Sequence, residues 1–326
     1  MKIGLAVAAA AASVLLTTTP SRATPAYNVQ TFQFPTDPTF TQLLGINDAQ
    51  TIVGYHGAQV NKGFTLTLPN TFTDTNFPGS DQTQVTGVSG APAETKVGFY
   101  MTAGVTHGFI DFAGNFLTAD LAGTAFNQQL GISADGTRIA GYSSLDPAGA
   151  TLQRAFIGTA GTSGGAFNGT ITDINGLLPS NVNSQATGIN NAGVAVGFFM
   201  PTMTTSLGFI DDNGMISTLD PFGSTFTQAL GISSTGEIVG FYQDAGGVQH
   251  GYTDIGGVFT SFDPSGATST TINGVNGRGQ LVGFFVDANN NTIGFLASPV
   301  PEPASIMLLG VGLTGLIAAR KRRPRG

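Results

Sequence analysis

The side chains best suited to chemistry are few in this sequence. It has no cysteine, which excludes cysteine nucleophiles, thiolate metal sites and a disulfide framework. Of the three histidines, His56, His107 and His250, the last two occupy the same position of a repeated pattern. That position holds Lys62, Arg154, Leu207 or Ile293 in the other copies. Because it accepts cationic and aliphatic residues alike, we expect structural histidines rather than catalytic or metal-binding ones.

Aspartates also recur, at the end of the last predicted strand of several copies: Asp37, Asp120, Asp220 and Asp263. Carboxylates from different copies could converge on one face, as glycosidase acids or cation ligands. The alternative is that each forms a local turn, since most precede proline and an aspartate carboxylate accepts nearby backbone N–H groups. We favour turns, because a catalytic pair would normally break the repeat.

The segment that begins at Asp287 and reads DANNNT starts like a calcium-binding loop. It lacks the glycine and the closing glutamate of such loops, so we interpret it as a turn. No nucleophile elbow, zinc-protease helix, phosphate loop or dinucleotide-binding motif occurs in its required context. We therefore predict no catalytic residue, no cofactor and no metal.

The elements that carry these residues repeat six times along the chain. A Gly-Ile or Gly-Val pair opens each copy at Gly45, Gly87, Gly131, Gly188, Gly231 and Gly274, with spacings of 42, 44, 57, 43 and 43 residues. A second glycine recurs at Gly54, Gly98, Gly141, Gly197, Gly240 and Gly283. An aromatic residue follows at Phe64, Phe109, Phe156, Phe209, Tyr252 and Phe295.

Each copy contains short β-branched or aromatic runs separated by Asn, Asp and Gly turn residues, which is typical of β-hairpins. The 47 glycines among 326 residues fit a chain with many tight turns. A period near 43 residues with four strands matches a propeller blade. We predict an all-β, six-bladed β-propeller over residues 24–299.

The ends of the repeat region predict how the ring closes. The last copy stops at Ser298 without a fourth strand, whereas Val29–Pro38 (VQTFQFPTDP) resembles the fourth strand of other copies. In this alignment Phe34 matches Phe262 and Leu219. The N-terminal strand is therefore expected to complete the last blade and remove both sheet edges.

The third copy contains an insertion. Its uncharged, glycine-rich segment GTAGTSGGAFNGT covers residues 158–170. One aberrant loop on a regular scaffold can carry function. We favour the alternative, a tolerated surface excursion.

The N-terminus has the pattern of a secretory signal peptide over residues 1–23. Lys2 precedes an apolar run, and Ser21 and Ala23 fit the small-residue rule for cleavage after Ala23. Cleavage after Ala26 is the second choice, and an uncut signal anchor is the alternative. The expected processing partner is a signal peptidase.

Residues 300–326 form a second targeting segment. Ala304–Ala319 is an uncharged stretch of 16 residues. As a transmembrane helix it would reach only ~24 Å at ~1.5 Å per residue, short of a ~30 Å hydrocarbon core. A basic cluster that should stay in the cytoplasm occupies residues 320–325: Arg320, Lys321, Arg322, Arg323 and Arg325.

This end closely resembles the PEP-CTERM sorting signal of Gram-negative bacteria. The resemblance rests on Val300, Pro301, Glu302 and Pro303, followed by the apolar stretch and the terminal basic cluster. It implies recognition by a membrane-embedded exosortase, which removes the tail after a transient association with the inner membrane. The body is then released to the cell surface or an extracellular polymer matrix. An ordinary C-terminal anchor is the alternative.

The charge balance of the chain limits the classes of binding partner. Only five basic residues lie outside the two targeting segments, namely Lys62, Lys96, Arg138, Arg154 and Arg278, so the mature body is acidic. This argues against nucleic acid, whose phosphates need basic patches. Thr106–Asp111 (THGFID) and Gln249–Asp254 (QHGYTD) also resemble extracellular HAF-type repeats, which implies a surface protein of mostly unassigned function.

Two classes of function remain. The first is a non-enzymatic surface or matrix protein that binds exopolysaccharide or another surface protein through the propeller faces. The second is a carbohydrate-active enzyme, a glycosidase or lyase, which rests on fold analogy alone. Uniform copies and the lack of a repeat-breaking acid favour the binder. The side chains that line the central channel would discriminate between the two.

Overall fold

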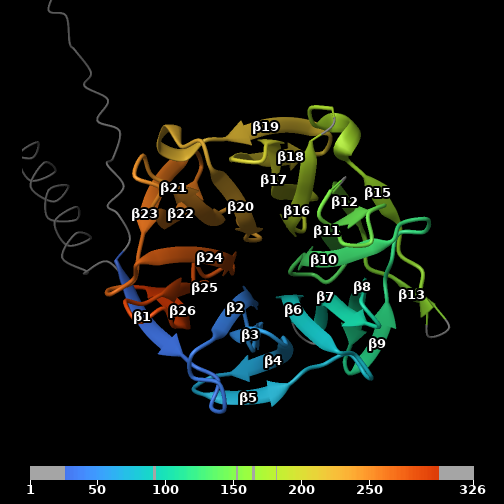
Figure 1. Cartoon of the computed structure of the whole chain (residues 1–326), viewed down its shortest axis with the longest axis horizontal. Coiled ribbons are helices and arrows are strands. Elements are labelled where there is room, and N and C mark those ends of the chain that lie inside the picture. Colours follow the sequence, from blue (N-terminus) through green and yellow to red (C-terminus); the bar gives the residue numbers. More distant parts are fainter. Residues whose placement is uncertain (1–25, 91–92, 152, 164–165, 181, 301–326) are drawn as a thin grey trace, which may run out of the picture.

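The computed structural model describes residues 26–90, 93–151, 153–163, 166–180 and 182–300. In these residues, six four-stranded antiparallel sheets surround a central axis (Figure 1). The only helical segments in the described ranges are two 3-10 turns, Asn175–Leu177 and Pro221–Gly223. The predicted all-β, six-bladed propeller is confirmed.

Each blade has an inner strand at the axis and three further strands that lead outward. The first three blades are β2–β5 (Thr41–Ile46, Thr51–His56, Lys62–Thr67, Thr71–Asp74), β6–β9 (Gln82–Val88, Thr95–Thr102, Val105–Phe112, Asn115–Thr118) and β10, β11, β12, β15 (Phe126–Ile132, Arg138–Ser144, Arg154–Thr159, Ile171–Asp173). The fourth and fifth are β16–β19 (Asn183–Ile189, Val194–Thr202, Thr205–Asp212, Met215–Leu219) and β20–β23 (Thr227–Ile232, Ile238–Gln243, Gln249–Ile255, Val258–Phe262). The sixth contains β24 (Ser269–Val275), β25 (Leu281–Val286), β26 (Thr292–Pro299) and β1 (Tyr27–Phe32).

The antiparallel order gives the ring two distinct faces. We call the first the linker face, because it carries the segments that join one blade to the next, such as residues 75–81 between β5 and β6. It also carries the hairpins between the second and third strands of each blade. We call the opposite one the turn face, and each inner strand runs from the linker face to the turn face.

The sixth blade combines the two ends of the repeat region. β1 lies antiparallel to β26 as the outer strand of this blade, and Phe32 is opposite Gly294 (Figure 1). In the fifth blade, Phe262 is opposite Gly251 in the same way. Phe32, and not Phe34, is therefore the equivalent of Phe262, so the alignment proposed from the sequence is wrong by two residues.

Phe34 has a different role because it lies beyond the end of β1, in the linker to the first blade. Its ring stacks on His56 with centroids 3.6 Å apart and also contacts Phe64 and Phe72. Phe77, in the next linker, stacks in the same way on Tyr100 of the second blade. The linker thus places an aromatic ring on the blade that follows it.

The second and third repeated positions of the sequence form cross-strand pairs. Gly54 is opposite Phe64, and the same pairing recurs in every blade, ending with Gly283 opposite Phe295. All six aromatic rings are fully buried. The glycine leaves room for the ring: at Gly141 an added Cβ would lie 2.6 Å from the ring of Phe156. Burial of such a ring is worth about 1.5–3 kcal/mol.

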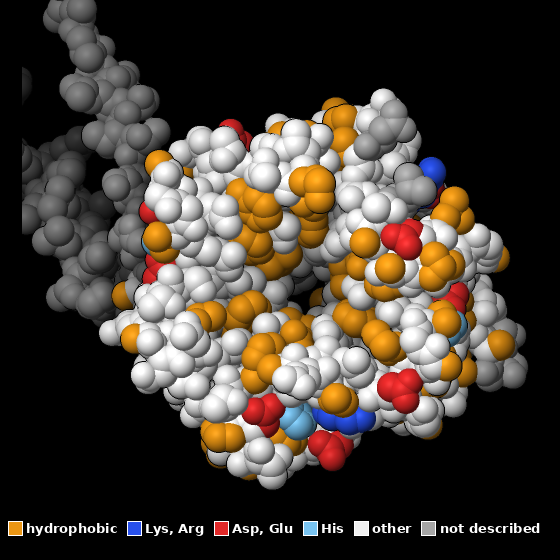
Figure 2. Space-filling view, in the orientation of Figure 1, with side chains coloured by type: hydrophobic (Ala, Val, Ile, Leu, Met, Phe, Trp, Pro, Cys, Tyr) orange, Lys and Arg blue, Asp and Glu red, His pale blue; other side chains and the backbone are white. Residues whose placement is uncertain are grey.

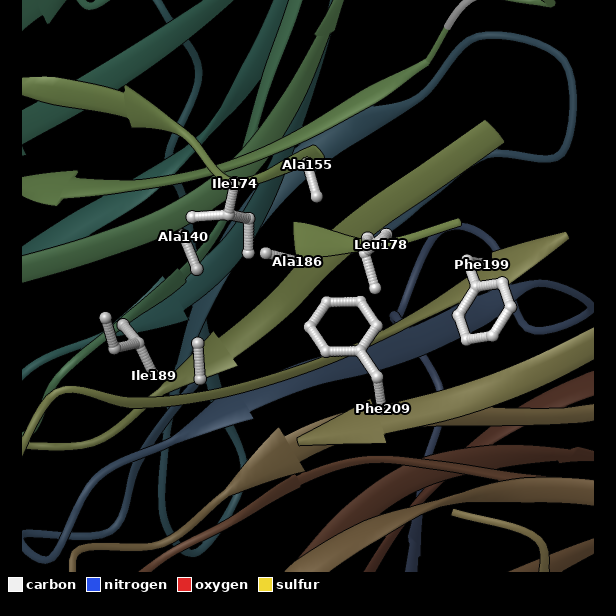
Figure 3. Packing of buried hydrophobic residues seen from close by; sticks show 9 residues of the cluster. Ala140, Ala155, Ile174, Leu178, Ala186, Ile189, Phe199 and Phe209 are labelled. Atoms are coloured by element: carbon white, nitrogen blue, oxygen red, sulfur yellow. The ribbon is translucent and has the colours of Figure 1, made fainter. Parts of the chain in front are cut away.

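Neighbouring blades pack face to face, and their buried side chains form the core between them. Figure 3 shows the contact between the third and fourth blades. Ala140 and Ala155 come from the third blade, and Ala186, Phe199 and Phe209 come from the fourth. Small residues on one sheet face large ones on the other, so the two sheets interdigitate.

Candidate functional site

Each of the three histidines is paired with an aspartate of the repeated set, toward the linker face. The pairs are His56 Nδ1 with Asp37 Oδ2 at 3.6 Å, His107 Nδ1 with Asp120 Oδ2 at 2.7 Å, and His250 Nδ1 with Asp263 Oδ2 at 2.7 Å. They belong to different blades, so the carboxylates do not converge. Asp220 precedes a 3-10 turn without making a side-chain cap.

His250 contacts a second carboxylate as well, because Asp244 Oδ2 lies 3.5 Å from its Nε2. The hydrogen bond to Asp263 is the main cause that raises the pKa of His250 above its ordinary value, and Asp244 adds to it. The pKa of Asp244 is lowered, chiefly by the backbone N–H of Val248. Both effects favour the charged forms of an ion pair at the surface.

No cluster of three or more His, Asp or Glu side chains within the described residues is placed to hold a metal ion. The carboxylate of Asp287 accepts hydrogen bonds from the backbone N–H groups of Asn289 and Asn291 and from the Asn291 side chain. These donors account for the turn that we inferred from the sequence at Asp287.

The central channel is lined by the inner strands at their opening glycines. An added Cβ at Gly131 would lie 2.7 Å from Thr187 O and 2.9 Å from the Cα of Gly188, so neighbouring inner strands nearly touch. The remaining space is about 70 Å³. The glycines are required for this close approach of six strands at the axis.

One residue before each of these glycines, the inner strand has a β-bulge. A bulge leaves one residue without a partner in the ladder, and here that residue faces the channel. Around the ring the bulged residues alternate between leucine and a hydrogen-bonding residue: Leu44, Thr86, Leu130, Thr187, Leu230 and Asn273.

The polar bulge residues join the blades in pairs. Thr86 donates to Gln129 O at 2.9 Å, and Thr187 donates to Ala229 O at 2.7 Å. Asn273 of the sixth blade donates to Leu43 O of the first at 3.0 Å. Each bond crosses from one inner strand to the next, so the alternation stabilises the ring around the channel.

On the linker face the channel widens into a mouth of about 220 Å³. Its rim carries Gln84, Gln128, Gln185 and Gln228 from successive inner strands. We call this set, with the bulge residues below it, the glutamine ring. Figure 2 shows hydrophobic side chains gathered around a central opening of the propeller.

Aromatic residues stand opposite these glutamines on the second strands. Gln84 is paired with Phe99, Gln185 with Phe198, and both rings line the mouth. Every side chain that lines the mouth is uncharged. The site therefore combines flat apolar surfaces with amides that can both donate and accept hydrogen bonds.

The glutamines differ in what holds them. Gln84 Nε2 donates to Asn61 Oδ1 at 2.7 Å, and Gln185 Nε2 donates to Gln153 Oε1 at 2.9 Å. Within the described residues, the side-chain amides of Gln128 and Gln228 make no hydrogen bond. Two rim amides are thus held in place by the preceding blade, while two are available to a ligand.

The repeat contains a signal for this ring that was not among the candidate residues predicted from the sequence. Glutamine stands three residues before the opening glycine in five of the six copies: Gln42, Gln84, Gln128, Gln185 and Gln228, with Thr271 in the sixth. Glutamine is neither titratable nor a common metal ligand, so a search for reactive groups passes over it.

The insertion of the third copy lies away from the channel. Part of it forms the hairpin β13 (Thr162–Ser163) and β14 (Ala166–Phe167) outside the blade (Figure 1). The following segment, with Arg154, lines a cavity of about 330 Å³ between the third and fourth blades. Arg154 forms an ion pair with Asp173 at 2.6 Å.

The comparison with protein families identifies the C-terminal segment. The model of the PEP-CTERM protein-sorting motif matches residues 299–323. The chain carries a PEP-CTERM sorting motif. This motif implies an exported protein that an exosortase processes and sorts to the cell envelope. A search of curated proteins finds no match for the chain.

Several solved structures are distantly similar to this chain. TolB from Acinetobacter baumannii is 11% identical with a TM-score of 0.47, and the match covers 76% of this chain and 63% of TolB. The lectin of Aleuria aurantia, in complex with Fucα1-6GlcNAc, is 12% identical with a TM-score of 0.46 over 82% and 97% of the two chains. The propeller domain of the Trilobed protease from Pyrococcus furiosus is 10% identical with a TM-score of 0.48 over 83% and 84%. These similarities are too distant to indicate a function. The fold is assigned from the pairing of the strands in this structure.

The targeting segments lie largely outside the described residues. The following predicted features lie outside the described residues: the signal peptide at 1–23, the motif residues Pro301, Glu302 and Pro303, the predicted span 304–319 and the basic cluster 320–325. In the part that the structure describes, no helix is long and apolar enough to cross a membrane. Val300, the first residue of the sorting motif, is about half exposed, and its backbone N–H donates to Ala26 O at 2.8 Å.

Proposed function

We propose that this protein is a non-enzymatic surface or matrix component that binds a neutral glycan in the glutamine ring on the linker face. The observation that carries the proposal is the uncharged mouth of the channel, in which amides and aromatic rings surround one opening. Sugar hydroxyls act as both donors and acceptors, and amide side chains match them in both roles. The apolar faces of sugar rings pack against aromatic side chains.

The sorting signal supports the expected location of this binding. After the signal peptidase and exosortase have acted, the body would be released to the cell surface or the extracellular matrix, where exopolysaccharide is the abundant polymer. The resemblance of the third strands to HAF-type repeats points to the same compartment. A net charge of −7 for the whole chain disfavours anionic polymers as ligands.

The alternative, a glycosidase or lyase, would need acid groups near the bound sugar. The mouth is lined by Gln, Asn, Thr, Leu and Phe, which can hold a sugar but supply no proton at neutral pH. The paired aspartates lie in separate blades, each with its own histidine. This arrangement supports binding over hydrolysis.

The test is glycan binding by the purified body, measured by calorimetry against a panel of neutral and acidic oligosaccharides. The double variant Gln128→Leu with Gln228→Leu should weaken binding at least tenfold, because it removes the two amides without internal partners. Gln30→Leu, an exposed position on the outer strand β1, is the matched control. Full affinity in the double variant, or release of reducing sugar by the parent, would contradict the proposal.

A further inference from the structure

A second cavity adjoins the mouth of the channel, toward the rim of the propeller. This cavity has a volume of about 250 Å³ and lies over the second blade, between the first and the third. Gln84, Phe99 and Gln128 line both cavities. We call the two together the linker-face groove. Because the same three side chains border both cavities, a ligand that passes over these side chains can occupy the mouth and the outer cavity together.

The outer part of the groove has the same chemistry as the mouth. Its remaining side chains are Asn61, Gln82, Thr83, Met101, Thr106 and Phe126, all of them uncharged. Amides and hydroxyls thus accompany two apolar surfaces, the thioether of Met101 and the ring of Phe126. A chain of linked neutral sugars meets similar surroundings along the whole groove.

One wall of the groove is held rigid by a network of amides. The Asn61 backbone N–H donates to Gln82 Oε1 at 3.2 Å, and its Oδ1 accepts from Gln84 Nε2. The Asn61 side chain in turn donates to Gly57 O at 2.6 Å. Within the described residues, these bonds leave Gln84 Oε1 without a hydrogen bond. Polar groups fixed before binding lower the entropy that a ligand must overcome.

The opposite wall is held by the loop before β12. Gly149 approaches the ring of Phe126 so closely that an added Cβ would lie 2.6 Å from it. Asp146 holds this loop by accepting hydrogen bonds from the backbone N–H groups of Ala148 and Thr151. The ring of Phe126 also packs against the ring of Tyr142, with the two centroids 5.6 Å apart.

We infer that the ligand of the linker-face groove is a linear neutral oligosaccharide of at least two linked rings, bound from the channel mouth outward over the second blade. The inference rests on the proposed function and adds the length and the path of the ligand. Small-molecule sites usually measure ~300–1,000 Å³, and neither cavity alone reaches that range. Joined, they do.

The test fills the outer part of the groove and leaves the mouth intact. Met101→Trp places a large ring at the outer end. Met200→Trp is the matched control, because Met200 is opposite Asn183 in the fourth blade as Met101 is opposite Gln82 in the second. The probes are glucose, galactose and mannose and their neutral linear trimers and pentamers, measured by calorimetry with the purified body.

We expect the parent and Met200→Trp to bind one of the trimers at least tenfold more tightly than its monosaccharide. Met101→Trp should lose this preference and keep the monosaccharide affinity. Two results would contradict the extended ligand and leave the proposed binding at the mouth unaffected. In the first, a sugar binds but the parent does not prefer the trimer; in the second, Met101→Trp retains the preference for the trimer. If the parent binds no member of the panel, the proposed function fails as well.

Discussion

Gly240 in the second strand of the fifth blade offers a sharp test of how the repeat works. A Cβ added at this position would lie 2.0 Å from the carbonyl oxygen of Gln228 on the inner strand. Real Cβ atoms essentially never come closer than 3.0 Å to such an atom. Gly240→Ala must therefore push the backbones of β20 and β21 apart, next to the β-bulge that follows Ala229.

The expected cost follows from this geometry. Overpacking that shifts the backbone costs typically 1–3 kcal/mol, and the atom in the way belongs to a paired strand rather than a flexible side chain. We expect a loss of about 2–3 kcal/mol in the free energy of unfolding. At roughly 2–4 °C per kcal/mol for a domain of this size, the melting temperature should fall by about 4–12 °C.

The assay is thermal unfolding of the purified body by circular dichroism. Gly176→Ala is the matched control, because nothing lies within 4 Å of an added Cβ there. Gly283→Ala repeats the test in the sixth blade, where Thr271 O would lie 2.0 Å away. If Gly240→Ala melts at the temperature of Gly176→Ala, the second glycine of the repeat is tolerated rather than required.

Three further predictions address the ring closure, the sorting signal and the paired histidine. Deletion of Tyr27–Phe32 should leave β26 with an open edge and abolish cooperative unfolding or lower solubility; an unchanged melting curve would show that β1 does not stabilise the ring. Glu302→Ala with Pro303→Ala should trap the uncut precursor in the membrane fraction, and intact mass of the exported parent should lack the basic tail; a tail still attached would indicate a plain anchor. The pKa of His250, followed by NMR, should lie above its ordinary value of 6.5 and fall in Asp263→Asn. Because the pKa of His250 is raised in the folded protein, the parent should have a larger free energy of unfolding than His250→Asn. This difference should be fully present below about pH 6 and should disappear as the pH rises through the folded pKa.

The fold class and the sorting signal of this protein could both be predicted from contiguous stretches of its sequence. Six copies of a glycine and aromatic pattern predict the blades because cross-strand pairs recur at a fixed register, so a local pattern carries over into each sheet. The C-terminal motif is likewise read from contiguous residues, which the family comparison matches at 299–323. Both depend on short stretches of chain, and such stretches can be recognised without coordinates.

The contacts between residues of different repeat copies depend on the tertiary structure. The sequence shows that His250 and Asp263 recur in the repeat, but only the structure shows that their Nδ1 and Oδ2 atoms lie 2.7 Å apart. The alignment of the closing strand from the sequence was wrong by two residues. The candidate site depends on residues that are distant along the chain, such as Gln84 and Gln228, which line one opening only because six inner strands converge at the axis. A glutamine has no intrinsic reactivity to mark it, so its role follows from its position around a channel, and closure of the ring sets that position.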